Sequence, residues 1–136
     1  MKYINKKMVV AINRICTEIT GGAVVSATNI RSGVALNFVD GIYYNRVFGQ
    51  QLYPDIFHQA AAYMFHIVKN HVFTDGNKRT GLCCALTFLE WNGYTIKPLH
   101  EDKVFDFVVQ IAGGPNQLEQ IPVIAAWLQT EIVSDV

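Results

Sequence analysis

The stretch His71-Val72-Phe73-Thr74-Asp75-Gly76-Asn77-Lys78-Arg79-Thr80-Gly81 brings an imidazole, a carboxylate, a glycine, an amide and two adjacent cations close together. Gly76 can turn tightly, and its amide can approach an anion closely because no side chain intervenes. Lys78 and Arg79 supply the positive charge that a polyphosphate requires. The segment therefore predicts an active-site loop, residues 71–79, that handles phosphate groups.

Apolar residues at helical spacing follow this loop. Leu82, Ala85, Leu86 and Leu89 fall at i, i+3, i+4 and i+7, which is typical of one face of an amphipathic helix. We therefore predict a helix over about residues 77–91. Anions bind well at a helix N-terminus, so the amides from Gly76 onward are suited to phosphate.

The rest of the chain also has mainly helical periodicity. A first helix over about 5–20 should bury one face and end at Gly21-Gly22. The pattern from 26 to 39 is weaker, but Asn29 can cap a second helix there, with Ile30, Val34 and Phe38 as its buried positions. A wide apolar surface over 55–70 predicts a central, buried helix. Two more helices carry Val104 to Ile111 and Ile121 to Ile132. The expected buried face of the first helix consists of Met8, Ile12, Ile15 and Ile19.

Residues 40–53 follow a different pattern. Asp40-Gly41 is a turn signal, and the next residues favour extended structure. We expect a short β-hairpin, or flap, over about 40–53. As an alternative, three aromatic side chains of this segment pack beneath a loop: Tyr43, Tyr44 and Phe48.

Composition limits the possible functions. The 136 residues are 51% hydrophobic, which is enough for one domain, 1–136, with a core. The 11 basic and 11 acidic residues cancel, so no overall charge attracts nucleic acid or an anionic membrane. The N-terminal residues match neither a secretion signal nor a membrane span. The three cysteines, Cys16, Cys83 and Cys84, have no disulfide-framework spacing, so we expect reduced core thiols in a cytoplasmic protein.

The loop sequence resembles the HxFx(D/N)(G/A)NKR signature of the death-on-curing branch of the Fic/Doc family. The similarity extends over about residues 45–95, from Phe48-Gly49-Gln50-Gln51-Leu52-Tyr53-Pro54-Asp55 to Phe88-Leu89-Glu90-Trp91-Asn92-Gly93-Tyr94. The resemblance implies an all-α, compact Fic/Doc-type domain of five to six helices with a short β-hairpin flap. In this family the flap lies over the active-site loop and can hold the target by backbone pairing.

Each polar residue of the loop has a candidate role and a plainer alternative. His71 is the candidate general base, since histidine titrates near neutrality; otherwise it is a cap or surface residue. Asp75 suits Mg²⁺ beside bound phosphates, and its alternative is a helix N-cap. Four residues, Gly76, Asn77, Lys78 and Arg79, are expected to contact the phosphates of ATP. In the alternative, Lys78 and Arg79 are only a solvated basic pair at the start of a helix. Phe73 is expected to anchor the loop to the core.

Two positions depart from the pattern of AMP-transferring Fic enzymes, HxFx(D/E)GNGRxxR. Lys78 replaces a glycine that lets the diphosphate lie along the loop, and Leu82 replaces an arginine that grips the γ-phosphate. Death-on-curing toxins share the lysine. The resemblance therefore implies a kinase that presents the γ-phosphate of ATP to a threonine of a translation factor, elongation factor Tu.

The resemblance also implies a partner. Such toxins are blocked by a separate antitoxin, and this chain has no evident internal (S/T)xxxE(G/N) inhibitory motif. Two other functions remain open at this point: an AMP transferase that modifies a protein hydroxyl, and a non-enzymatic Fic-fold binding module.

Overall fold

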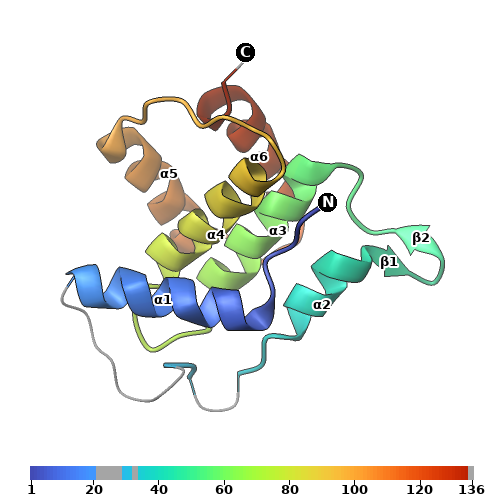
Figure 1. The fold of residues 1–136 in the computed structure, drawn as a ribbon, viewed down its shortest axis with the longest axis horizontal. Coiled ribbons are helices and arrows are strands. Elements are labelled where there is room, and N and C mark those ends of the chain that lie inside the picture. The colour runs from blue at the N-terminus through green and yellow to red at the C-terminus, as the bar shows by residue number, and fades with distance from the viewer. Residues whose placement is uncertain (21–28, 32–33, 135–136) are drawn as a thin grey trace.

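Helix α3 (Ile56–Lys69) runs through the centre of the molecule, and the other helices surround it (Figure 1). The computed structural model describes residues 1–20, 29–31 and 34–134. Six α-helices and one two-stranded hairpin are present in these ranges, which confirms the predicted all-α class. None of the helices in these ranges is long and apolar enough to cross a membrane.

The remaining elements follow the predicted order closely in the second half of the chain. Before α3 come α1 (Lys6–Thr20), α2 (Asn37–Tyr44), β1 (Arg46–Val47) and β2 (Gln50–Gln51). After it come α4 (Asn77–Trp91), α5 (Glu101–Gly113), α6 (Gln120–Trp127) and a π-helical turn, η1 (Leu128–Ile132). The predicted motif helix over 77–91 is thus confirmed.

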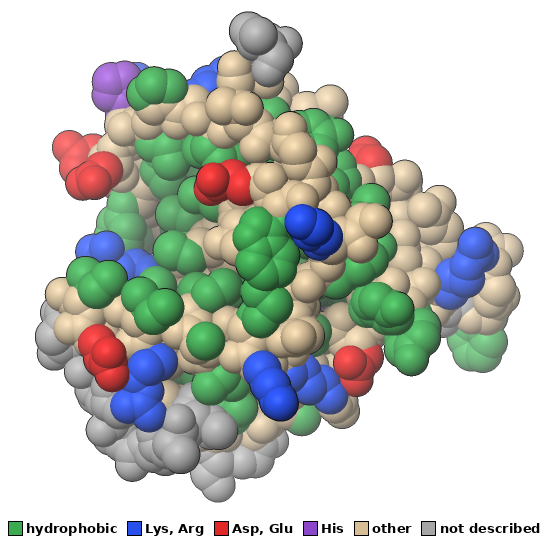
Figure 2. Space-filling view, viewed as in Figure 1, with side chains coloured by type: hydrophobic (Ala, Val, Ile, Leu, Met, Phe, Trp, Pro, Cys, Tyr) green, Lys and Arg blue, Asp and Glu red, His purple; other side chains and the backbone are tan. Residues whose placement is uncertain are grey.

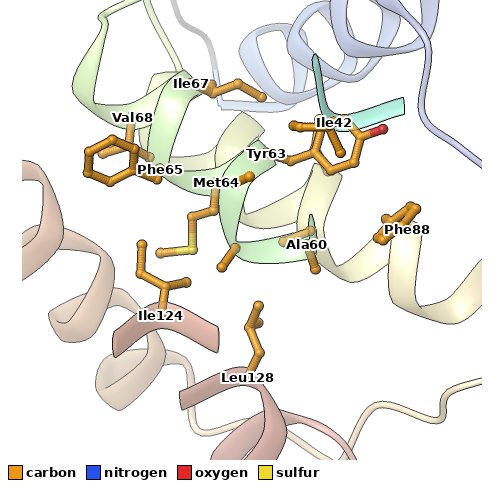
Figure 3. Close-up of a cluster of buried hydrophobic side chains, with 14 of the residues drawn as sticks. Ile42, Ala60, Tyr63, Met64, Phe65, Ile67, Val68, Phe88, Ile124 and Leu128 are labelled. Carbon is orange, nitrogen blue, oxygen red and sulfur yellow. The ribbon is translucent and has the colours of Figure 1, made fainter. Parts of the chain in front are cut away.

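Helix α3 is buried on nearly all sides because it packs against α4, α6, α2 and α5. Its small residues Ala60, Ala61 and Ala62 are fully buried and allow close approach, while Met64 and Phe65 fill the space toward the later helices (Figure 3). Tyr63 is also fully buried, and its hydroxyl donates to the Ile4 carbonyl at 2.9 Å. The central buried helix expected from the sequence is therefore confirmed.

The buried face of α1 differs from the expectation. Ile15 and Ile19 are 55% and 79% exposed, whereas Asn13 and Thr17 are buried with Val9. The prediction of a face built on Met8, Ile12, Ile15 and Ile19 is therefore wrong for Ile15 and Ile19, whereas Met8 and Ile12 are partly buried against the core. Apolar periodicity was misleading because α1 turns two polar side chains inward, where they form hydrogen bonds.

The predicted second helix is wrong over most of its length. Residues 29–31 are not helical, and Ile30 forms an isolated antiparallel bridge with Phe73. Asn29 is buried with φ of 59° and does not cap a helix, because long-range hydrogen bonds compete with its capping tendency. Residues 26–28 and the proposed stop at Gly21-Gly22 lie outside the described residues.

The hairpin lies within the predicted flap but is shorter. Strands β1 and β2 pair antiparallel, with Arg46 opposite Gln51, and the turn residues Phe48 and Gly49 have φ of 51° and 77°. Positive φ at both positions is typical of the turns that match strand twist. The start at residue 40 is wrong, because Asp40 and Gly41 lie inside α2.

Three aromatic residues of this region are exposed. Tyr43, Tyr44 and Phe48 are 56%, 71% and 101% exposed, respectively. Tyr43 still makes an edge contact with Tyr3, at 5.1 Å between ring centroids. The alternative in which all three pack beneath a loop is therefore wrong.

Helices α3 and α4 are in close contact at Gly81, which is buried. A Cβ atom there would lie 2.8 Å from Cγ2 of Val68 and 3.1 Å from the main-chain oxygen of Met64. Neither atom belongs to a long flexible side chain, so the helices themselves would have to separate. The position of the α4 N-terminus therefore depends on the missing side chain at Gly81.

We predict that Gly81→Ala lowers the free energy of unfolding by about 1 to 3 kcal/mol because overpacking outweighs the better helix propensity of alanine. The matched control is Gly41→Ala in α2, where an added Cβ meets no described atom within 4 Å. That variant should be neutral or more stable by up to about 1 kcal/mol. Urea denaturation monitored by circular dichroism measures both. Equal effects of the two substitutions would contradict the close-packing argument.

Candidate active site

The predicted site residues lie on the loop between α3 and α4 and in the first turn of α4. In Figure 1 the loop passes beneath α1 before entering α4. Val72 and Phe73 point into the core, with exposures of 0% and 1%, whereas His71 and Asp75 are exposed. Phe73 is therefore the apolar anchor that the sequence predicted, and the polar groups are turned outward around it.

Residues 29–31 hold the outer edge of the loop. The Arg31 amide donates to the Val72 carbonyl at 2.9 Å, and the Thr74 amide donates to the Asn29 carbonyl at 3.0 Å. The Thr74 hydroxyl also donates to Oδ1 of Asn29 at 2.6 Å. Sequence reasoning missed this contact, because nothing in the local pattern indicates that residues 29 and 74 meet.

Asn13 holds the loop from the side of α1. Its side chain is fully buried, and Nδ2 donates to the Asp75 carbonyl at 2.8 Å and to the Thr80 hydroxyl at 3.1 Å. Oδ1 of Asn13 accepts a long hydrogen bond of 3.4 Å from Asn29. One amide thus links α1, the segment before α2, the loop and the first turn of α4. Sequence analysis missed Asn13. The available signal was its spacing, since Val9, Asn13 and Thr17 are four residues apart and therefore share one face of the helix.

Asn77 organises the loop internally. Its Oδ1 accepts from the Phe73 amide and its Nδ2 donates to the Phe73 carbonyl, both at 2.9 Å. These paired hydrogen bonds fix the path of the three residues between Phe73 and Asn77. The side chain is therefore already engaged with the backbone, and its predicted contact with phosphate remains a prediction.

Gly76, not Asp75, occupies the N-cap position of α4. Gly76 has φ of 78°, and a Cβ there would lie 3.0 Å from Cγ2 of Thr17, so both conformation and space require glycine. Oδ1 of Asp75 accepts from the Gly76 amide at 2.8 Å. The N-cap alternative for Asp75 is wrong because α4 begins one residue too late for it.

His71 has an unfavourable backbone conformation. It follows the last residues of α3 with φ of 47°, which is left-handed and costs a residue with a side chain about 1 to 2 kcal/mol. A glycine is usual at this position after a helix. Strain of this kind is often retained at functional sites. The conformation projects the imidazole at the surface beside the loop.

The first turn of α4 presents positive charge. The Thr80 amide is bonded to the Gly76 carbonyl at 2.8 Å, so the amides of Asn77, Lys78 and Arg79 precede the first intrahelical hydrogen bond. Lys78 and Arg79 are exposed. The guanidinium of Arg79 lies 5.8 Å from the ring centre of Phe105 on α5, within the range of a cation–π contact.

A cavity of about 820 Å³ begins at these two cations and extends between α1 and α5. Figure 2 shows this face hollowed and lined with hydrophobic side chains. Its volume is in the range of small-molecule sites. The lining includes Lys78, Arg79 and Leu82 on one wall and Asp102, Phe105 and Asp106 on another. His71 and Asp75 are not part of this lining, so the structure joins the cations, but not the proposed base, to the cavity.

We predict that Asn13→Ala lowers the free energy of unfolding by about 2 to 4 kcal/mol, since buried partners on Asp75 and Thr80 lose their donor. Hydrogen exchange should accelerate at residues 72–76 in particular. Ile15→Ala on the exposed face of the same helix is the control and should change stability by less than about 0.5 kcal/mol. Unchanged exchange in the loop would show that Asn13 does not hold it.

We predict that His71→Gly is more stable than His71→Ala by about 1 kcal/mol, because glycine accepts left-handed backbone without strain. At His58, inside α3, the same pair should have the reverse order, with alanine better by about 1 kcal/mol. Thermal and urea denaturation of the four variants measure this. The same order at both positions would refute backbone strain at His71.

Comparison with known proteins gives this geometry a family context. The sequence profile of the Fic/DOC family matches residues 3–89. A protein of Mycolicibacterium smegmatis named Toxin Doc is 34% identical over 76 residues, which are 55% of this chain and 58% of that protein. A protein of Escherichia phage P1 named Protein kinase doc is 37% identical over 67 residues, which are 49% of this chain and 52% of that protein.

The chain thus matches only slightly more than half the length of each of these relatives. The family profile covers more, since it extends from before α1 through α3, the loop and nearly all of α4. The resemblance inferred from the loop sequence is therefore confirmed, and the chain belongs to the Fic/DOC family.

Proposed function

We propose that this protein is a kinase that transfers the γ-phosphate of ATP to a serine or threonine hydroxyl of another protein. The observation that carries the proposal is the position of Lys78 and Arg79 in the first turn of α4, on a loop fixed by buried hydrogen bonds. The relative named Protein kinase doc supports phosphoryl transfer.

The phosphates would bind at the N-terminus of α4. The backbone amides at this helix end and the two cations would neutralise the charge of a polyphosphate. Positioning and charge neutralisation are the main requirements of phosphoryl transfer. The Lys78 side chain occupies the space that a glycine leaves open in AMP-transferring Fic enzymes. The α- and β-phosphates would then lie elsewhere, so that the γ-phosphate faces the acceptor.

His71 would act as the general base. An imidazole nitrogen takes the proton from the target hydroxyl as its oxygen attacks the γ-phosphorus, and the bond from that phosphorus to the β–γ bridging oxygen breaks to release ADP. His71 is exposed at the edge of the loop, where a macromolecular hydroxyl can reach it. Lys78 and Arg79 stabilise the charge that develops on the departing ADP.

Asp75 would hold Mg²⁺ with the nucleotide. Mg²⁺ usually retains several waters and binds one or two carboxylates together with phosphate oxygens. Asp75 fits this requirement, because it provides one exposed carboxylate beside the proposed phosphate-binding turn. Bound Mg²⁺ would supply neutralisation of phosphate charge. The engagement of Oδ1 with the Gly76 amide orients the carboxylate.

The target and the inhibitor are proposed from the family. Tyr44 at the end of α2 and Phe48 in the hairpin turn are exposed and offer an apolar docking edge for a protein. Elongation factor Tu is the translation factor to test first. By analogy with the relative named Toxin Doc, we also propose that the chain is a toxin that a separate antitoxin neutralises.

We predict that label from γ-labelled ATP, but not from α-labelled ATP, is transferred to elongation factor Tu or to a protein of a bacterial extract. His71→Ala should lower the rate by about 10²- to 10⁴-fold, because the base is lost. His100→Ala is the matched control, since His100 is an exposed histidine at the start of α5. Autoradiography of separated proteins, with phosphopeptide mapping, measures transfer.

Transfer of the α-label alone would replace the kinase proposal with AMP transfer. Absence of both labels from every protein, together with no binding of Mg-ATP by calorimetry, would favour a non-enzymatic binding module. Equal activity of His71→Ala and the His100→Ala control would remove His71 from the mechanism.

A further inference from the structure

Two cysteines distant in sequence meet at the wall of the cavity. The sulfur atoms of Cys16 on α1 and Cys83 on α4 lie 3.8 Å apart, and both residues are partly exposed and line the cavity beside Lys78 and Arg79. The expectation that all three cysteines are core residues is therefore wrong for these two. Cys84, the next residue of α4, is fully buried in the core.

The surroundings distinguish the two thiols chemically. The hydrogen bond between the two thiols lowers the pKa of Cys16 to about 7; burial opposes this shift, and a hydrogen bond with Thr80 and the charge of Arg79 support it. The hydrogen bond to Cys16, followed by burial, raises the pKa of Cys83. The thiol that accepts this hydrogen bond as a thiolate is the nucleophile of the pair, and the additional hydrogen bond with Thr80 favours Cys16 in that role.

We propose that Cys16 and Cys83 form an oxidation site, in which a peroxide converts the pair to a disulfide that links α1 to α4. The Cys16 thiolate attacks one peroxide oxygen; an S–O bond forms, the O–O bond breaks, and water or an alcohol leaves after protonation. Cys83 then attacks the Cys16 sulfur as its proton passes to the departing oxygen. An S–S bond forms, the S–O bond breaks, and water is released.

The geometry favours this pair over the other combinations. The sulfurs must move from 3.8 Å to about 2.05 Å, which requires side-chain rotation and a small shift of two helices that already pack together. Cys84 is next to Cys83 in sequence, but its side chain is directed into the core and its burial raises the pKa of that thiol. Oxidation would also remove the thiolate that lies near Arg79. The oxidation itself does not require that the protein be a kinase.

The test uses the full chain, reduced, desalted and treated with hydrogen peroxide before remaining thiols are alkylated. The expected product is a monomer about 2 Da lighter than the reduced chain, with one alkylatable thiol. Tryptic mapping should join the peptide containing Cys16 to the peptide containing Cys83 and Cys84. Cys84→Ala should give the same cross-link and thereby assign it to Cys83.

Two further variants test the order of the steps. In Cys83→Ser, Cys16 should accumulate as sulfenic acid, captured by dimedone, because the resolving thiol is absent. In Cys16→Ser, loss of the remaining thiols should be at least about 10-fold slower. Retention of all three thiols in the wild-type chain, or a cross-link that involves Cys84 or a second chain, would overturn the proposal.

Discussion

The hydrogen bonds of Asn13 hold together parts of the site that the chain connects only indirectly. This buried amide binds the Asp75 carbonyl and the Thr80 hydroxyl and meets Asn29, so α1, residues 29–31, the loop and α4 share one polar centre. A buried polar network is stable only when its members are satisfied. No described buried side-chain nitrogen or oxygen lacks a partner, so this condition is met. The outward direction of His71 and Asp75 follows from this inner attachment.

Local patterns predicted the elements whose stability comes from local spacing. The 3.6-residue period located α3, α4 and α5, and the Gly76 turn indicated the start of the loop helix. The same period also located α1 but misassigned part of its buried face, because Asn13 and Thr17 are buried and Ile15 is exposed. A hydropathy pattern treats every buried position as apolar, so it cannot identify a helix that buries amides for hydrogen bonding.

The errors before α3 have a related cause. Asparagine is a common helix-capping residue, but the backbone and side chain of Asn29 both form hydrogen bonds with Thr74, which is distant in sequence. Asp40-Gly41 resembles a turn, but the α2 surface that contains Val39 and Ile42 packs on α3 and overrides that preference. Of the candidate site, the residue types were evident from sequence, whereas their supports, Asn13 and Asn29, required the tertiary structure.

The start of α4 has several features that oppose helix stability. Gly76 caps it without a side-chain hydrogen bond, its first turn has no acidic residue, and Lys78 and Arg79 lie against the positive end of the helix dipole. Such an end would fray in an isolated helix. Here the absence of a side chain at Gly81 allows the next turn to pack closely against α3, and the Thr80 hydroxyl accepts a hydrogen bond from Asn13. Packing one turn further along therefore maintains an exposed, positively charged helix end, and a bound polyphosphate would reduce the remaining electrostatic repulsion.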